Sequence, residues 1–211
     1  MLSKWHEMTV LPRLYAIADA SFGDPVEIAR QLFGGGARLV QIRNKRIGAG
    51  GLLEEVEQVL RIAPQDARVI VNDRVDVASL GGAHGVHLGQ DDLPVEPARQ
   101  ILGENALIGY STHNLDQALQ ADRLPVDYIA VGPVYPTTSK ENPDPVLGVE
   151  QLSRICHAVH KPVVAIGGIT LERATEVFAA GAQSVAVIGD LLKYEDLAAR
   201  TRLWLESMGT Q

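Results

Sequence analysis

The 211-residue chain has little of several features that would place it in common protein classes. A single cysteine, Cys156, excludes an intrachain disulfide, so nothing in the chain requires an oxidising compartment. No apolar run approaches the ~18 residues of a membrane-spanning helix, and residues 1–9 lack the apolar stretch of a signal peptide. We therefore expect a cytoplasmic protein. Aromatic residues make up only 5% of the chain against 46% for all hydrophobic residues, which predicts an aliphatic core.

Positive charge is also scarce. The 19 Lys and Arg residues are outnumbered by 26 Asp and Glu residues, and the net charge is −7. No basic run or stripe is present, so the sequence argues against nucleic acid and anionic membranes as partners. We expect small-molecule partners, and any phosphate must be bound by a few local cations and by backbone N–H groups. The sequence does not indicate an oligomeric state.

Short apolar runs alternate with helical patterns along the whole chain. The runs that we expect to form strands are 14–18, 38–42, 68–71, 86–88, 106–108, 128–131, 162–166 and 184–188. Strands that are apolar on both faces and separated by helices predict a parallel sheet, and eight such units can close into a barrel. The expected fold is α/β, a single (β/α)8 TIM barrel over 1–211 with 1–11 as an N-terminal extension. The alternative is an open doubly wound sheet, but residues 19–23 lack its Gly-x-Gly-x-x-Gly turn.

Cationic side chains follow two of the expected strands. Arg43 and Lys45 come at the end of the second strand, and Lys140 lies in the long connection after the sixth. The carboxyl ends of barrel strands meet at one rim, where the reacting groups of such enzymes lie. Three cations there suit a ligand with several negative charges, such as a pyrophosphate. The alternative is three solvated surface charges, because most Lys and Arg side chains are exposed.

Two acidic side chains follow the third and fourth expected strands. Asp73 and Asp92 would repel each other at neighbouring strand ends unless a cation lay between them. Mg²⁺ is typically bound by one or two carboxylates together with substrate phosphates. Either residue could instead cap the helix that follows it, and the spacing does not decide between Asp91 and Asp92.

Glycines after the last two strands indicate a second anion site. Barrels often bind phosphate through the loops after strands seven and eight, where exposed backbone N–H groups face the anion. Gly167 and Gly168 follow the seventh strand, and Gly189 follows the eighth. Glycine pairs are also common in ordinary turns, so this prediction depends on their position after strand seven.

The histidines and serines do not match a known catalytic motif. Ser111 lacks the Gly-x-Ser-x-Gly turn of a serine nucleophile, and no residue is evident to orient His113 as in a catalytic triad. We therefore expect Ser111 to hydrogen bond to a substrate. The spacing of His84 and His87 argues against a zinc site.

Six segments in this order resemble the thiamine phosphate synthase family. They are Gln41–Lys45, Asn72-Asp73, Gly85–Asp92, Gly109–His113, Gly132–Lys140 and Ala165–Ile169. The resemblance extends over nearly the whole chain, from Leu14 to Ile188. It implies an enzyme that condenses 4-amino-2-methyl-5-pyrimidinylmethyl pyrophosphate with a thiazole phosphate. Thiamine phosphate and pyrophosphate would be formed through a carbocation, with Mg²⁺ as cofactor.

The same resemblance implies a role for individual residues. It implies catalytic roles for Arg43, Lys45, Ser111 and Lys140. It implies substrate-binding roles for Gln41, Asn72, Thr137, Ser139, Gly168, Ile188 and Gly189. The Mg²⁺ ligands would be Asp73 and Asp92. The family often has serine at the position of Gly189, so a hydroxyl contact with the thiazole phosphate would be absent here.

Three alternative functions remain open from the sequence. A thiazole tautomerase on the same fold would move a proton, a role that His113 could fill, but it would not need a Mg²⁺–pyrophosphate site. A non-catalytic barrel would bind a phosphorylated metabolite without releasing pyrophosphate. A sugar-phosphate isomerase would rest on analogy of fold alone.

Overall fold

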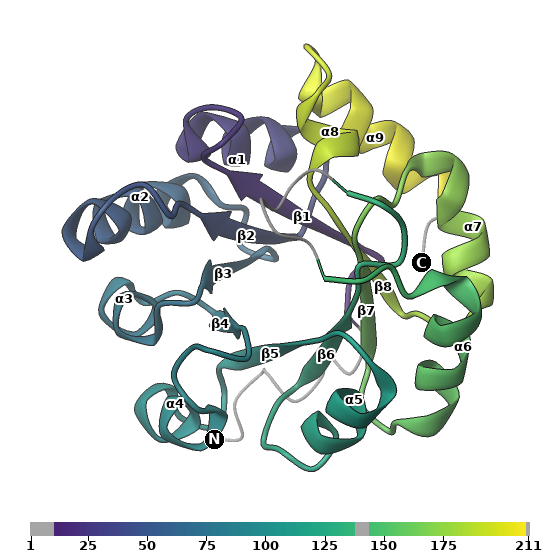
Figure 1. Ribbon diagram of the computed structural model, residues 1–211. Helices are drawn as coiled ribbons and strands as arrows, with labels where there is room; N and C mark the ends of the chain where they lie inside the picture. The colour runs from purple at the N-terminus through teal and green to yellow at the C-terminus, as the bar shows by residue number, and fades with distance from the viewer. Residues whose placement is uncertain (1–10, 138–143, 210–211) are drawn as a thin grey trace.

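The computed structural model describes residues 11–137 and 144–209, in which eight parallel strands close into a barrel surrounded by helices (Figure 1). The expected TIM barrel is thereby confirmed. The strands are β1 (Leu14–Asp19), β2 (Leu39–Arg43), β3 (Arg68–Asn72), β4 (Gly85–Leu88), β5 (Leu107–Thr112), β6 (Tyr128–Val131), β7 (Val163–Ile166) and β8 (Ser184–Val187). Each strand pairs with the next, and β8 pairs with β1 to complete the ring. The expected N-terminal extension lies outside the described residues except for Leu11.

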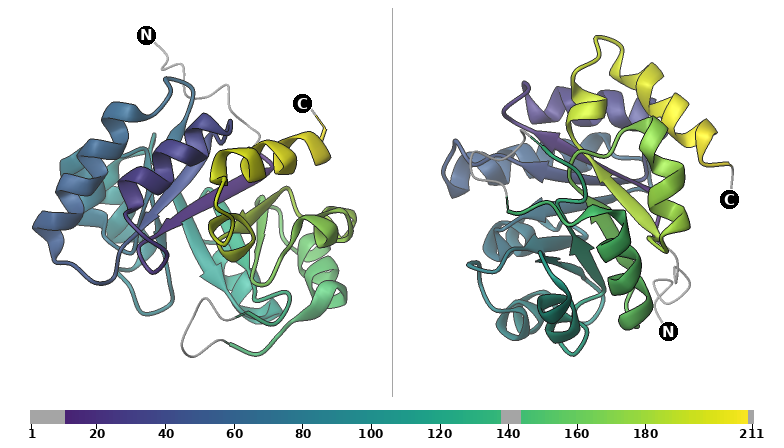
Figure 2. Two further views of the ribbon diagram at one scale, coloured as in Figure 1. Left: turned by 90° about the horizontal axis from the view of Figure 1, so that it is seen from above. Right: turned by 45° about the vertical axis from the view of Figure 1, so that its right-hand side comes forward.

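Helices cover the outside of the barrel. They are α1 (Pro25–Gly34), α2 (Ala49–Ile62), α3 (Val75–Gly81), α4 (Val95–Leu102), α5 (Leu115–Ala121), α6 (Gly148–Ala158), α7 (Leu171–Ala179), α8 (Gly189–Leu192) and α9 (Leu197–Ser207). α1 begins as expected, because Asp24 accepts a hydrogen bond from the N–H of Val26 and Pro25 occupies the first turn. Both views in Figure 2 place α9 beside α1, and Gly35 allows this close approach to Thr201. None of the described helices is long and apolar enough to cross a membrane.

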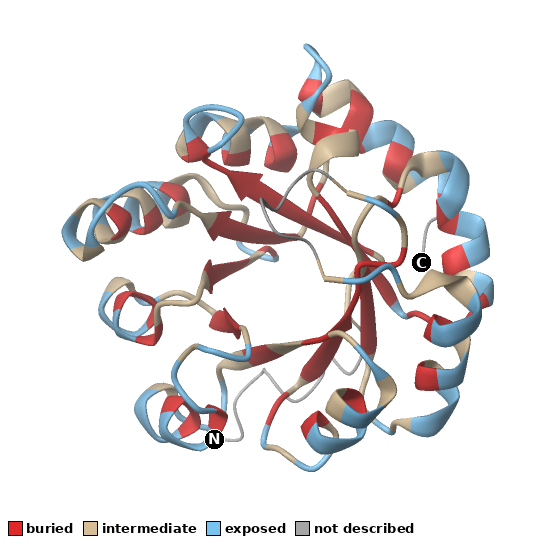
Figure 3. Ribbon diagram, in the orientation of Figure 1, coloured by how far each residue is buried: buried red, intermediate tan, exposed pale blue. Residues whose placement is uncertain are grey.

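Alternating strand residues build two apolar layers, because successive side chains point to opposite faces of a strand. Ala16, Val40 and Ile42 point outward and join the core between strands and helices. Tyr15 and Leu39 belong to a separate cluster inside the barrel. Figure 3 shows the strands almost wholly buried. The double burial explains why the strands appear in the sequence as continuous apolar runs.

Two elements differ from the expected ones. β5 continues to Thr112, so Ser111 belongs to the strand and not to the loop after it. After the last strand we expect one helix over 194–207; the helix found there is α9, which begins at Leu197, and the short α8 precedes it. Asp190 joins the two, because its carboxylate accepts hydrogen bonds from Arg200 at 2.7 Å and Trp204 at 2.8 Å. These contacts tie the short α8 to α9 and cannot be inferred from helical periodicity.

Candidate active site

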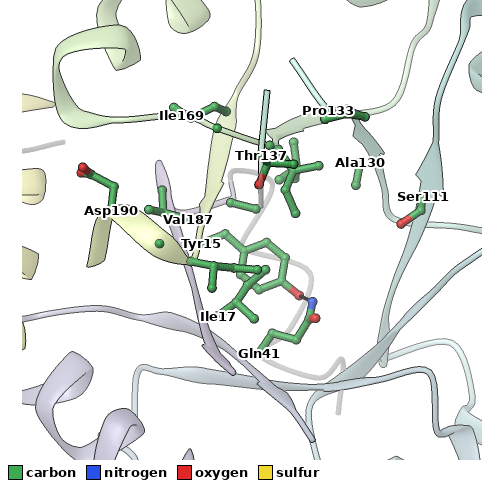
Figure 4. A pocket seen from close by; sticks show the side chains of 18 of the residues that line it. Tyr15, Ile17, Gln41, Ser111, Ala130, Pro133, Thr137, Ile169, Val187 and Asp190 are labelled. Carbon is green, nitrogen blue, oxygen red and sulfur yellow. Dashed lines mark hydrogen bonds between the residues drawn. The ribbon is translucent and has the colours of Figure 1, made fainter. Parts of the chain in front are cut away.

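The carboxyl ends of the strands surround a cavity of about 630 Å³. Figure 4 shows its interior, with Tyr15, Ile17 and Gln41 on one side and Ser111 and Ala130 on another. Eight of the residues to which the family resemblance gives a role line it: Gln41, Arg43, Asn72, Ser111, Thr137, Gly168, Ile188 and Gly189. Ser139 and Lys140 lie outside the described residues. The barrel therefore brings residues from β2 through the loop after β8 to one space.

Arg43 is held at the cavity wall by a carboxylate that the sequence analysis did not identify. The β1–β2 register places Asp19 opposite Arg43, and the Arg43 Nη1 atom lies 2.5 Å from Asp19 Oδ2. The other oxygen of Asp19 accepts a hydrogen bond from the N–H of Ser21 at 2.8 Å. The side chain of Asp19 is only 3% exposed. Asp19 ends β1 at the same rim as the predicted residues, and this position is the feature of the sequence that could have identified it.

Lys45, Asp73 and Asp92 do not line the cavity; they form a charged cluster next in sequence or space to Asn72, which does line it. The Nζ atom of Lys45 lies 2.9 Å from Asp73 Oδ2. Asp73 has a φ of 63°, a left-handed conformation that is uncommon outside glycine and is often found at functional sites. Asp92 Oδ2 accepts a hydrogen bond from the N–H of Gly89 at 2.6 Å. The neighbouring Asp91 is exposed, so Asp92 is the residue that faces Asp73.

The electrostatics of this cluster fit a bound cation. Burial raises the pKa of Asp92; the hydrogen bond from Gly89 opposes this effect, and the charge and side-chain contact of Asp73 raise the pKa further. A divalent cation between the two carboxylates would remove their repulsion. The described residues contain no group of three or more His, Cys, Asp or Glu side chains placed for a metal. Two carboxylates alone suit an ion such as Mg²⁺, which is typically bound by one or two carboxylates together with phosphate and water.

The opposite side of the cavity offers backbone and cationic groups. Gly168 has a φ of 62°, and a Cβ there would lie 2.4 Å from the carbonyl oxygen of Pro136, so the two loops pass very close together. Gly189 begins α8, and the end of the Lys193 side chain lies near the position that its Cβ would take. Arg173 donates to the Gly168 carbonyl at 2.7 Å. Arg173 and Lys193 both line the cavity, although the sequence analysis identified neither.

Buried polar side chains form the floor of the cavity. His87 Nε2 lies 2.9 Å from Ser111 Oγ, and His87 Nδ1 lies 3.1 Å from the hydroxyl of Tyr128. The hydroxyls of Tyr15 and Tyr128 are 2.9 Å apart, and Gln41 Nε2 donates to Tyr15 at 2.8 Å. His87 therefore acts as a hydrogen-bonding residue of the barrel interior. The sequence analysis identified Gln41 and Ser111 but not the contacts that join them, because the five members of this set lie on five different strands.

Comparison with known proteins assigns the family. The chain matches the family model described as thiamine monophosphate synthase over residues 14–191. A thiamine-phosphate synthase of Koribacter versatilis is 47% identical over 189 residues, which are 86% of this chain and 90% of that protein. A thiamine-phosphate synthase of Anaeromyxobacter dehalogenans is 44% identical over 183 residues, or 87% of this chain and 82% of that protein.

The chain belongs to the thiamine monophosphate synthase family. A solved structure, the thiamine phosphate pyrophosphorylase from Pyrococcus furiosus, superimposes with a TM-score of 0.84 at 36% identity, covering 93% of this chain and 97% of that one. The thiamine monophosphate synthase match begins at β1 and ends within α8. It therefore includes every strand that contributes to the cavity.

Proposed function

We propose that this protein condenses 4-amino-2-methyl-5-pyrimidinylmethyl pyrophosphate with a thiazole phosphate to give thiamine phosphate and pyrophosphate. The observation that carries the proposal is one cavity with two separate regions for anions. Arg43 stands at the end of β2, and Gly168 and Gly189 stand at the ends of β7 and β8. Two phosphorylated substrates could thus be held together with their reacting rings between these regions. Membership of the family supports this assignment.

The β2 side is suited to the pyrophosphate. Arg43 and Lys45 would bind its oxygens, and the resemblance adds Lys140 from outside the described residues. Asp73 and Asp92 would hold Mg²⁺, which would offset negative charge on the diphosphate. The leaving group gains charge as its bond to carbon breaks, and preorganised cations placed there lower the barrier. Asp19 keeps the Arg43 guanidinium in place before the substrate arrives.

The remaining residues would hold the two rings and the second phosphate. Gln41, Asn72 and Ser111 offer polar groups for the aminopyrimidine, whose 4-amino group helps to expel the pyrophosphate. The thiazole nitrogen has a free electron pair and attacks the resulting carbocation without a general base. The thiazole phosphate would be bound by Thr137, Ser139, Gly168, Ile188 and Gly189. The reacting carbon would be buried between the two rings, and this burial excludes water that would otherwise trap the carbocation.

A direct assay tests the proposed function. Purified protein is mixed with both substrates and Mg²⁺, and pyrophosphate and thiamine phosphate are measured over time. We expect the two products in equal amounts, and much less thiamine phosphate when the metal is removed with a chelator. Binding of the substrates without pyrophosphate release would favour the non-catalytic barrel. Isomerisation of a thiazole substrate without pyrophosphate release would favour the tautomerase.

Gly168→Ala is expected to raise the KM for the thiazole phosphate at least about tenfold, with a smaller change for the pyrimidine substrate. The added Cβ would lie 2.4 Å from the Pro136 carbonyl, so the loop at the second anion region must move. Steady-state kinetics with each substrate varied in turn provide the measurement. Gly82→Ala is the matched control, because Gly82 has a similar φ of 70° but nothing within 4 Å of the added atom. Equal KM changes for both substrates in Gly168→Ala would argue against a thiazole phosphate site here.

A further inference from the structure

A continuous chain of hydrogen bonds crosses the barrel interior and ends at the cavity. It begins at Gln41 on β2, passes through Tyr15 on β1 and Tyr128 on β6, and continues through His87 on β4 to Ser111 on β5. The four successive distances between heavy atoms are 2.8, 2.9, 3.1 and 2.9 Å. In Figure 4 the Gln41 amide lies against the hydroxyl end of the Tyr15 ring, and Ser111 lies across the cavity.

The barrel is shaped around the middle of this chain. A Cβ at Gly109 would lie 2.0 Å from the Tyr128 ring. Only glycine at this position of β5 leaves room for that ring. The Tyr128 ring meets Tyr15 edge-on at a centroid distance of 5.8 Å and stacks on His87 at 5.7 Å. Both tyrosines are almost completely buried. Burial raises the pKa of both hydroxyls, so each keeps its proton and can donate one hydrogen bond.

The first member of the chain sets its direction. The Gln41 amide nitrogen can only donate, so the Tyr15 oxygen accepts from it. The Tyr15 proton then has the Tyr128 oxygen as its acceptor, and the Tyr128 proton has His87 Nδ1. With Nδ1 as an acceptor, the neutral His87 ring carries its proton on Nε2 and donates to Ser111 Oγ. If every hydrogen bond ran in the reverse direction, the buried Tyr15 hydroxyl would have no acceptor for its proton. A buried donor without a partner lowers the stability of the fold.

We propose that this chain fixes Ser111 as a hydrogen-bond donor toward the cavity, with Tyr15, Tyr128 and His87 as positioning residues. Because the Ser111 oxygen already accepts from His87, its own proton is left for a ligand. The ligand atom that faces Ser111 must then be an acceptor without a proton. An unprotonated pyrimidine ring nitrogen meets this condition, and this identification of the ligand rests on the proposed function. The chain would thus select the neutral form of the aminopyrimidine.

The protonation of His87 in the substrate-free protein tests the proposal. Nitrogen NMR of the histidine side chains distinguishes a proton on Nε2 from one on Nδ1. The signal that disappears from the spectrum of the His87→Asn variant is the signal of His87. We expect His87 to carry its proton on Nε2. His113 is an internal reference of the opposite kind, because its Nδ1 lies 2.7 Å from the Gly132 carbonyl and must carry a proton. A proton on Nδ1 of His87 would overturn the proposal.

A remote substitution tests the direction of the chain. In Gln41→Glu an ionised carboxylate can only accept, so the order reverses and the His87 proton moves from Nε2 to Nδ1 as the carboxyl group titrates. The same substitution in a Tyr128→Phe background should have no such effect, because phenylalanine lacks the hydroxyl that links Tyr15 to His87 in the series of hydrogen bonds. A His87 signal that stays unchanged in Gln41→Glu at alkaline pH would contradict the proposal. If Gln41→Glu does not fold, the wild-type spectrum alone decides.

These measurements need no substrate, so they are independent of the activity assay. A protein that makes thiamine phosphate while His87 carries its proton on Nδ1 would retain the proposed function and lose the hydrogen-bond chain. A protein with the expected His87 signal and no pyrophosphate release would retain the chain and lose the proposed function, together with the pyrimidine as its ligand.

Discussion

Asp92→Asn is expected to lower kcat about 100- to 1000-fold at limiting Mg²⁺, the range found when one preorganised electrostatic group is removed from an active site. Asparagine keeps the size of the side chain, and its oxygen can still accept the hydrogen bond from Gly89. It removes the negative charge that would hold the cation beside Asp73. The Mg²⁺ concentration for half-maximal activity should therefore rise together with the loss of rate. Steady-state assays across a Mg²⁺ titration measure both effects.

Asp91→Asn is the matched control for this variant. Asp91 is adjacent in sequence but exposed, whereas Asp92 contacts Asp73. We expect Asp91→Asn to retain nearly the activity and the Mg²⁺ dependence of the wild type. Full activity of Asp92→Asn at low Mg²⁺, or a larger loss in Asp91→Asn, would show that the metal ligands are wrongly assigned.

Arg43→Met is expected to lower kcat/KM about 100- to 1000-fold, because the leaving pyrophosphate loses a preorganised cation. The same variant should lose about 3 kcal/mol of stability, since removal of one partner leaves a buried charge uncompensated. That charge belongs to Asp19, whose side chain is 3% exposed. Urea unfolding gives the free energy of unfolding, and steady-state kinetics with the pyrimidine substrate give kcat/KM.

The double variant Asp19→Asn/Arg43→Met separates the two effects. Removing the buried carboxylate should restore most of the stability without restoring activity, because the missing guanidinium acts on the substrate. Asp19→Asn alone leaves Arg43 in place with a weaker partner, so we expect a smaller loss of kcat/KM than in Arg43→Met. Recovery of activity in the double variant would mean that Arg43 acts only through the fold.

The order of the strands could be predicted from sequence because burial on both faces makes each strand a short apolar run. The extent of β5 could not, since Gly109 interrupts its apolar pattern. That glycine is required by the Tyr128 ring, which packs where its side chain would be. The short α8 was also missed, because it is held by hydrogen bonds between Asp190 and side chains of α9. Local patterns identify elements, whereas such contacts decide where they end.

The rim of the cavity was predictable for a similar reason. Once eight parallel strands are expected, polar residues such as Gln41, Asn72 and Ser111 must converge, because all the strands point the same way. The partners of these residues were not predictable. Asp19 is found only from the register of β1 against β2, and the hydroxyl contact between Tyr15 and Tyr128 joins residues 113 positions apart. Spacing in the sequence also left open the choice between Asp91 and Asp92.

The proposed function requires one cavity that is divided into two regions for anions. A crystal structure of the protein with Mg²⁺, pyrophosphate and the thiazole phosphate tests this division most directly. We predict pyrophosphate beside Arg43, with the metal between Asp73 and Asp92, and the thiazole phosphate at the backbone of Gly168 and Gly189. Pyrophosphate at the glycine loops, or a metal bound away from both aspartates, would contradict this arrangement of the site.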